Sequence, residues 1–171
     1  HGMKKKIKSS DNFYGPWYYE MHEAGFNYRI TDIQCALGSS QLKRLGSFLK
    51  RRREIAKRYD KSLSKVPGLQ IPIISNNVEH AYHLYPLQIN FDMFDINKVD
   101  FFKKMNKAGI NPQVHYIPIH LQPFYKKMYG FSHGDYLLAE KFYEKEVSLP
   151  IYPNLKNEEQ RLVIDTIIKI I

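Results

Sequence analysis

The sequence predicts an α/β fold in which a long helix precedes a two-layer domain, a small sheet with helices on one face. Two observations predict it. Apolar residues recur with helical spacing from residue 32 to about residue 65, and beyond residue 67 three extended segments alternate with three helical ones. We therefore divide the chain into an N-terminal segment, residues 1–30, a connecting helix, residues 31–66, and a small α/β domain, residues 67–171.

The composition is that of a folded chain with enough apolar material for a core. Hydrophobic residues make up 43% of 171 residues, which excludes wholesale disorder. The formal net charge of +9 points to an anionic partner such as nucleic acid, an anionic membrane or a phosphorylated small molecule. The single Cys35 excludes an internal disulfide and fits a reducing compartment. The sequence has no apolar run of membrane-spanning length and opens on no signal peptide, so we expect a cytoplasmic protein without a membrane partner.

The first thirty residues read as irregular structure. Residues 1–12 are basic and polar and predict a mobile surface loop. Residues 13–30 are rich in aromatic side chains, which indicates a loop packed on a larger body or on a second subunit. The chain begins with His1 and Gly2, which are either an expression scar or the continuation of a longer protein.

The segment just before the long helix is the first candidate site. Thr31 suits a helix N-cap, and Gln34 completes a capping box. In an extended segment Asn27 and Arg29 fall on one face, where an amide and a guanidinium suit a phosphate or carboxylate. The alternative is ordinary loop chemistry, with Asn27 in a turn and Arg29 in a surface ion pair, and the spacing alone favours it. Cys35 is expected to be a small buried hydrophobe on the helix.

The sequence of residues 31–66 predicts a helix with one apolar stripe and one basic face. Gly38 and Gly46 are weak points where it is expected to bend, and Pro67 and Gly68 end it. The basic face predicts either nucleic-acid contact or solvation, and solvation is favoured because acidic residues interrupt it. The apolar stripe consists of Leu42, Leu45, Phe48, Leu49, Ile55, Ala56, Tyr59 and Leu63.

The small domain begins with a short extended segment and the first of three predicted strands. Residues 69–74 are extended, and residues 82–91 alternate as a strand, where Pro86 demands an edge strand or an early strand position. A helix follows, capped by Asp95 and stopped by Gly109.

The second half of the domain repeats the alternation. Residues 110–116 predict a strand and are followed by a proline-rich turn, and a helix is expected over about 135–146. Residues 147–150 form a third short strand. The last helix is expected to be capped by Asn157 with Gln160.

The end of the second of these strands is the other candidate site. His115, Tyr116, His120 and Tyr125 can all donate hydrogen bonds to a ligand; the alternative is a turn with surface histidines. A zinc site is not favoured, because the histidine pairs lack cysteine or suitably spaced carboxylate ligands. Phosphate-binding glycine loops and a Gly-x-Ser-x-Gly motif are absent, and no carboxylate stands out as a general acid or base.

Several of these stretches together resemble a known family. Residues 25–38 followed by Gln41-Leu42, and later residues 114–120 and 148–151, resemble in order the landmarks of the DegT/DnrJ/EryC1/StrS nucleotide-sugar aminotransferases. Residues 13–21 and the His115 block resemble the branch that makes pseudaminic acid precursors, the UDP-sugar 4-aminotransferases. The resemblance implies the C-terminal portion of the aspartate aminotransferase fold: a connecting helix followed by a two-layer small domain with a short, largely antiparallel sheet.

The resemblance also implies a chemistry. Family members use pyridoxal 5'-phosphate to move an amino group from glutamate to a 4-keto sugar, here a UDP-4-keto-6-deoxy sugar. The Schiff-base lysine lies upstream of the His-Gly in the family, and Lys4, Lys5 and Lys6 do not match its motif. The isolated chain is therefore expected to be inactive, with a homodimer or a missing N-terminal portion as its partner.

By the same resemblance, Asn27 reaches the cofactor phosphate of the other subunit, and His115 and Tyr116 lie by the nucleotide sugar. Arg29, His120 and Tyr125 are further expected substrate-binding residues. Two other classes of function remain open: a basic nucleic-acid-binding module, and a non-catalytic interaction domain that kept the fold.

Overall fold

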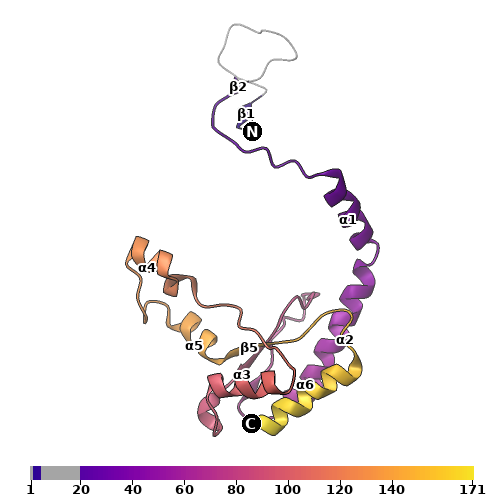
Figure 1. Ribbon diagram of the computed structural model, residues 1–171, viewed down its shortest axis with the longest axis vertical. Helices are drawn as coiled ribbons and strands as arrows, with labels where there is room; N and C mark the ends of the chain where they lie inside the picture. Colours follow the sequence, from indigo (N-terminus) through magenta and orange to yellow (C-terminus); the bar gives the residue numbers. More distant parts are fainter. Residues whose placement is uncertain (1, 5–19) are drawn as a thin grey trace. The chain divides into compact units, whose positions relative to one another are not determined.

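A computed structural model describes residues 2–4 and 20–171 of the chain (Figure 1). It divides into two compact units, residues 1–43 and residues 44–171. The loop expected over residues 1–12 and the aromatic lead-in of residues 13–19 lie largely outside the described residues. The assignment of residue ranges to the domains of a larger enzyme stays a prediction.

The described residues of the first unit form one short strand pair and one helix. Strand β1, Met3–Lys4, pairs antiparallel with strand β2, Glu20–Met21, and Met3 lies opposite Met21. Residues 3 and 4, which were expected to belong to a loop, therefore form a short strand. Helix α1 covers Asp32–Leu42 and begins with the predicted capping box. The Gln34 amide donates to Thr31 Oγ1 at 3.3 Å, and the Thr31 amide donates to Gln34 Oε1 at 3.0 Å. This reciprocal pair satisfies two amides that the helix itself leaves free.

Helix α1 buries none of its residues. Ile33 is 83% exposed and Leu37 61% exposed, and Cys35 is exposed as well. The prediction that Cys35 is a buried hydrophobe is therefore wrong for this structure. An 11-residue helix that buries no side chain is stabilised mainly by its cap and its own hydrogen bonds.

The predicted connecting helix is interrupted. Helix α2 covers Leu45–Leu63, so Lys43 and Arg44 separate it from α1. The expected weak points, Gly38 and Gly46, both lie inside helices, and Arg44 at the N-cap of α2 makes no side-chain capping bond. The sequence did not reveal this break, because helical periodicity alone does not register a two-residue turn.

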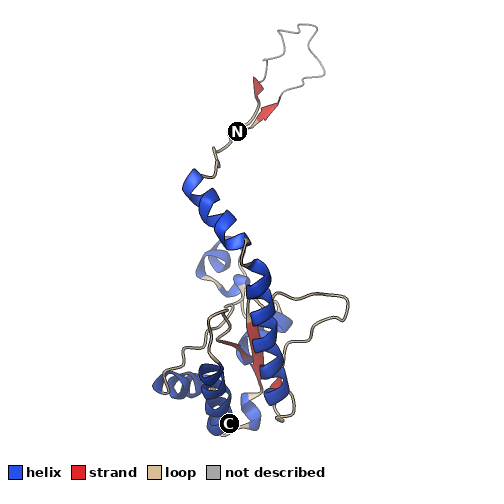
Figure 2. Ribbon diagram, turned by 90° about the vertical axis from the view of Figure 1, so that its right-hand side faces the viewer, coloured by secondary structure: helices blue, strands red, loops and turns tan. Residues whose placement is uncertain are grey.

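The second unit is built on a three-stranded antiparallel sheet, which lies beside α2 in Figure 2. Its strands are β3, Leu69–Gln70, β4, Tyr85–Ile89, and β5, Glu146–Leu149, in the order β3-β4-β5. The α/β class and the antiparallel sheet are confirmed. The strand expected over residues 110–116 is wrong, since only Gln113 pairs there, by an isolated bridge to Ser148.

Pro86 occupies the second position of the central strand β4, which is the early strand position that the sequence allowed as one of two alternatives. Ser148, opposite Pro86, exchanges both of its backbone hydrogen bonds with Gln113, at 2.8 and 3.2 Å. Pro86 and Ser148 are therefore a non-hydrogen-bonded pair, and the proline nitrogen faces the β3 side. On that side β3 pairs only with Gln88 and Ile89, so it offers no partner to residue 86. The missing N–H of Pro86 therefore costs the sheet no hydrogen bond.

One face of the sheet and three helices enclose the core. Helices α2, α3, Lys98–Lys107, and α6, Asn157–Ile170, contribute its helical part, and α6 lies beside both α2 and α3 (Figure 1). Only the C-terminal half of the predicted α2 stripe is buried. The fully buried side chains of this core are Ile55, Ala56, Tyr59, Leu63, Tyr85, Leu87, Ile89, Phe101, Met105, Val147 and Ile167.

Two predicted helix starts are shifted along the chain. Asn97, and not Asp95, caps α3 by accepting a 2.9 Å hydrogen bond from the Asp100 amide. Lys156 precedes α6, so Asn157 is its first residue, and its side-chain oxygen Oδ1 instead accepts hydrogen bonds from Arg51 and Arg58. A polar residue before an apolar run marks a helix start only to within a residue or two.

The arginines of α2 bind within the domain. Arg52 Nη1 donates to the carbonyls of Tyr82, His83 and Ile151, and Arg53 Nε donates to the carbonyl of His80. The solvated basic face expected for this helix is therefore wrong at these positions. These guanidinium groups satisfy loop carbonyls that the small sheet leaves unpaired.

Candidate functional site

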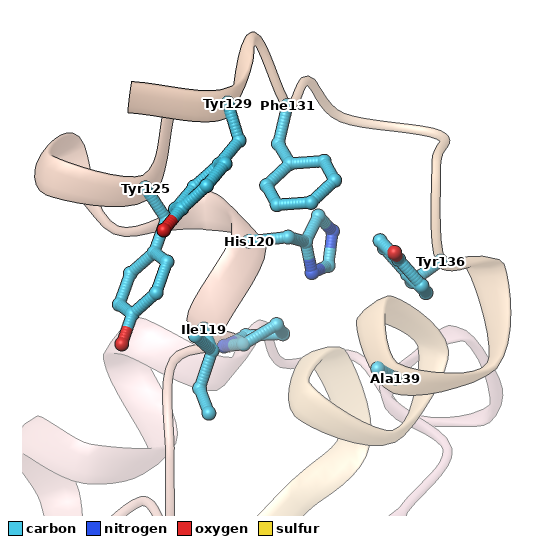
Figure 3. A pocket seen from close by; sticks show the side chains of 8 residues that line it. Ile119, His120, Tyr125, Tyr129, Phe131, Tyr136 and Ala139 are labelled. Atoms are coloured by element: carbon cyan, nitrogen blue, oxygen red, sulfur yellow. The ribbon is translucent and has the colours of Figure 1, made fainter. Parts of the chain in front are cut away.

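A cavity of about 600 Å³ opens in the second unit beside two short helices. Helix α4, Pro123–Tyr129, follows the 3₁₀ turn Ile119–Leu121, and α5 covers Leu137–Lys145. Figure 3 shows the side chains that face the cavity, most of them aromatic. Its lining consists of Pro118, Ile119, His120, Tyr125, Tyr129, Phe131, Tyr136 and Ala139.

Helix α4 places two tyrosines side by side in this cavity. Tyr125 and Tyr129 are one helical turn apart, and their rings stack with centroids 6.1 Å apart and planes 23° apart. Gly130 ends the helix with a φ of 71°, a conformation that glycine adopts without strain. The chain then returns so that Phe131 contacts Tyr129 and Tyr136, with centroids 5.9 and 5.8 Å apart. Helix α4 was missed in the sequence because Pro123 was taken for a turn, whereas proline suits the first position of a helix.

A buried hydrogen bond between two side chains supports the cavity. His120 Nε2 lies 2.7 Å from Glu140 Oε1, and the two side chains are only 6% and 3% exposed. Glu140 also accepts hydrogen bonds from the amides of Gly134, at 2.9 Å, and Tyr136, at 3.4 Å. The Glu140 carboxylate thus ties α5 to the loop before it and to His120.

Opposing effects set the pKa of Glu140. Burial alone would raise it, but the hydrogen bonds from His120 and from the Gly134 and Tyr136 amides, together with the nearby His133, hold the pKa of this carboxyl below its usual value. His133 Nε2 lies 3.3 Å from Glu140 Oε2 at the exposed side of the pair. Nε2 is the His120 ring nitrogen that contacts Glu140, so Nδ1 is the ring nitrogen that remains for a ligand.

The structure brings together two of the four predicted ligand-binding residues of this region. His120 and Tyr125 line the cavity. His115 and Tyr116 do not: their rings contact each other at 4.7 Å, and Tyr116 is 71% exposed. Sequence reasoning missed Tyr129, and a spacing of four residues from Tyr125 was the signal that could have found it.

A second buried carboxylate fixes the segment that carries His115. Glu146 of β5 is fully buried and accepts a 3.0 Å hydrogen bond from the His115 amide and another from the Ser148 hydroxyl. Because Glu146 pairs with Gln88, both point to the sheet face opposite the core. Glu140 and Glu146 are buried and hydrogen-bonded carboxylates that the sequence did not single out, and the expectation that no carboxylate serves as a general acid or base stays a prediction.

Asn27 and Arg29 lie in the first unit, in extended and exposed chain. Asn27 Oδ1 accepts a 3.3 Å hydrogen bond from the backbone amide of Arg29. This is the local turn contact expected if Asn27 has only an ordinary loop role. The side-chain amide nitrogen of Asn27 and the guanidinium of Arg29 bond to no group among the described residues. The surface ion pair expected for Arg29 in an ordinary loop is therefore not seen in the described part of the chain. Both groups are donors, so their chemistry fits an anionic group such as a cofactor phosphate.

Among the described residues, no group of three or more histidine, cysteine, aspartate or glutamate side chains is arranged so that it could hold a metal ion. None of the helices in the described ranges has the length and apolar character needed to cross a membrane.

The fold is shared with solved aminotransferases. Helicobacter pylori PseC, an aminotransferase involved in the biosynthesis of pseudoaminic acid, superposes with a TM-score of 0.79 at 31% identity, over 99% of this chain and 43% of that chain. The architecture is therefore that of an aminotransferase segment. The family model for DegT/DnrJ/EryC1/StrS aminotransferases matches residues 1–168, so the chain belongs to this family.

Two curated relatives align with the whole chain. An uncharacterised protein of Methanocaldococcus jannaschii, MJ1066, is 43% identical over 171 residues, which are 44% of its length. The UDP-4-amino-4,6-dideoxy-N-acetyl-beta-L-altrosamine transaminase of Campylobacter jejuni is 37% identical over 171 residues, 43% of its length. The chain thus spans less than half the length of the curated relatives it matches.

Proposed function

We propose that this chain is the C-terminal segment of a pyridoxal-phosphate-dependent nucleotide-sugar aminotransferase, which moves an amino group from glutamate to a UDP-4-keto-6-deoxy sugar. The observation that carries the proposal is the family match over residues 1–168, together with a transaminase relative aligned along the entire chain. The exposed lone thiol of Cys35 agrees with action in the reducing cytoplasm.

In this proposal Asn27 and Arg29 serve the cofactor side of the site. The Asn27 amide nitrogen donates to the phosphate of a cofactor held by a second protomer, and Arg29 adds a positive charge for an anionic group of the substrate. When bound, pyridoxal phosphate supplies the electron sink of the reaction. The exposure of both side chains supports the proposal, since a contact to another protomer requires that they are not used within their own unit.

The second unit serves the substrate side. His115 and Tyr116 contact the nucleotide sugar, and the Glu146 carboxylate holds the His115 amide so that the segment keeps its place. His120 and Tyr125 contribute from the aromatic cavity. The buried Glu140 keeps the His120 ring from rotating, so its Nδ1 stays available to a ligand.

Turnover requires a residue outside this set. None of the lysines in the sequence matches the family's Schiff-base lysine motif, so the chain alone binds and orients but does not transfer the amino group. A homodimer, with the remainder of the enzyme, completes the site. The nucleic-acid alternative loses support because Arg51, Arg52 and Arg53 are engaged with the domain's own carbonyls and carboxylates.

A chimera tests the proposal. This chain replaces the aligned segment of the Campylobacter jejuni transaminase, and amino-sugar formation from glutamate and a UDP-4-keto-6-deoxy sugar is measured. We expect activity from the chimera and none from the 171-residue chain alone. Asn27→Ala is expected to weaken cofactor retention in the chimera, whereas Asn154→Ala, at an exposed asparagine of the second unit, leaves it unchanged. A folded, dimeric chimera without activity contradicts the proposal, and activity of the chain alone contradicts its inactivity.

A further inference from the structure

We propose that a groove between α2 and α6 binds inorganic phosphate in a protonated form, at a place that the proposed amino transfer does not use. The inference goes beyond the proposed function and does not depend on it. The groove has a volume of about 390 Å³ and lies wholly within the second unit, where α2 and α6 are neighbours (Figure 1). The residues of its lining that matter here are Arg58, Lys61, Ser62, Gln160, Arg161 and Asp165.

The charged side chains of this groove are mainly positive. Arg58, Lys61 and Arg161 bring three positive charges to the lining, and Asp165 brings the one negative charge. Arg161 Nε already lies 3.6 Å from Asp165 Oδ2, so the charges of Arg58 and Lys61 remain uncompensated. Arg58 Nη1 donates to Asn157 Oδ1, a neutral acceptor that holds the guanidinium in place without cancelling its charge. Such a groove attracts a small anion.

A buried side chain of the same lining carries an unused acceptor. Gln160 is 1% exposed, and its Nε2 donates a 2.7 Å hydrogen bond to the carbonyl oxygen of Ile55. Oε1 of the same amide has no hydrogen-bond partner among the described residues. Because a buried acceptor without a donor is unfavourable, a ligand in the groove that donates to Gln160 Oε1 gains affinity.

The donors and the acceptor together select one kind of anion. The Lys61 ammonium and the Ser62 hydroxyl make no side-chain hydrogen bond to another described residue, so both can donate to an anion. Gln160 Oε1, in contrast, requires a donor from the ligand. Phosphate at neutral pH meets both requirements because it retains a P–O–H group beside its charged oxygens. Sulfate has the same tetrahedral shape but no proton, so it places an acceptor against an acceptor. The groove is therefore expected to prefer phosphate to sulfate.

Titration of the 171-residue chain with sodium phosphate and with sodium sulfate, at pH 7 and equal ionic strength, tests this preference. Amide NMR spectra measure the affinity and locate the bound anion. We expect phosphate to bind roughly tenfold more tightly than sulfate, the gain of one hydrogen bond to a charged group. We expect the shifted amides to cluster in residues 58–62 and 157–165, on the two sides of the groove.

Three variants separate charge from hydrogen bonding. Lys61→Met is expected to weaken phosphate and sulfate by a similar factor, because it removes a charge that attracts both anions. Gln160→Leu is expected to weaken phosphate alone and so to abolish the preference. Lys57→Met, at an exposed lysine of the same helix outside the groove, is the matched control and is expected to change neither affinity.

Equal affinities for phosphate and sulfate overturn the proposal, as do amide shifts confined to the region of residues 27–29. Absence of phosphate binding also overturns it and leaves Gln160 Oε1 to a water molecule. A folded Gln160→Leu variant that keeps the preference is equally decisive against it. If that variant does not fold, the parent chain and Lys61→Met decide: a Lys61→Met chain that binds phosphate as tightly as the Lys57→Met chain rejects the groove as the site.

Discussion

Arg52 Nη1 donates a 2.9 Å hydrogen bond to the carbonyl oxygen of Ile151, 99 positions further along the chain. The same nitrogen lies 2.9 Å from the carbonyl of Tyr82 and 3.2 Å from that of His83. One guanidinium therefore holds the segment before β4 and the segment after β5 against α2. Neither segment has sheet hydrogen bonds of its own at these carbonyls.

Arg52→Met tests the weight of this contact. Because the substitution leaves partly buried carbonyls without a donor, we expect the free energy of unfolding to fall by about 2 kcal/mol or more. Urea denaturation measures it. Arg161→Met, which removes an 83% exposed side chain from a surface ion pair, is the control and is expected to change stability by less than about 0.5 kcal/mol. Equal effects of the two substitutions would show that the three carbonyls find other donors.

Glu140→Gln separates charge from shape at the buried pair. The pKa of Glu140 is lowered in the folded chain from its ordinary value of 4.5, so its ionised form stabilises the fold at pH values above 4.5. That contribution is lost as pH falls through the lowered pKa. We therefore expect the glutamine variant to be less stable than the parent at pH 7, with the difference shrinking below pH 4.5.

Thermal denaturation between pH 3 and pH 7 measures this dependence. Glu144→Gln, at an exposed position of the same helix, is expected to track the parent across the range. A stability difference for Glu140→Gln that does not depend on pH would contradict an ionised carboxylate at this site.

Tyr85→Phe removes a buried phenol from a charged partner. The Tyr85 hydroxyl donates to Asp60 Oδ1 at 2.7 Å, and we expect the loss of this bond to cost about 1.5–3 kcal/mol. Tyr59→Phe, which removes a 2.8 Å bond to the neutral carbonyl of Pro150, is expected to cost about 0.5–1.5 kcal/mol. Urea denaturation of both variants compares them, and the reverse order would contradict the charged contact.

Alkaline pH provides a second readout of the same tyrosine. Burial, and then the hydrogen bond to Asp60, raises the pKa of Tyr85 above its ordinary value of 10.0. The unfolded chain therefore loses this proton first, and the parent is expected to lose stability as pH rises above 10.0. Tyr85→Phe should reduce that slope, as measured by denaturation between pH 9 and pH 11.

Adjacent isoleucines of α6 test the position of the core. Ile167 is fully buried and Ile168 is 48% exposed. Ile167→Ala is expected to destabilise the chain by about 2–5 kcal/mol, since it removes buried methyl groups and leaves a cavity. Ile168→Ala is expected to cost less than about 1 kcal/mol, and a larger loss there would place α6 in a different rotation about its axis.

Local features were predicted well and distant ones poorly. The Thr31 and Gln34 capping box was visible because its partners are three residues apart. The alternation that buries Tyr85, Leu87 and Ile89 was visible because a strand repeats every two residues. The strand expected near Gln113 failed because pairing depends on a partner strand, and β5 offers only Ser148 to this side.

The candidate site divides in the same way. His120 and Tyr125 were found from their polar character beside a strand end, but their partners were not. Glu140 lies 20 positions after His120, and nothing in the spacing announces a pair that only the return of α5 creates.

The sequence by itself determined the family, the alternation that buries Tyr85, Leu87 and Ile89 in β4, and the capped start of α1, because each depends on residue identity or on short-range periodicity. Only the tertiary structure decided which charged groups are buried, that the α2 arginines serve the domain's own carbonyls, and that aromatic rings from α4 and the following loop enclose one cavity. These depend on contacts between residues far apart in the chain, whose energies are set by packing and desolvation.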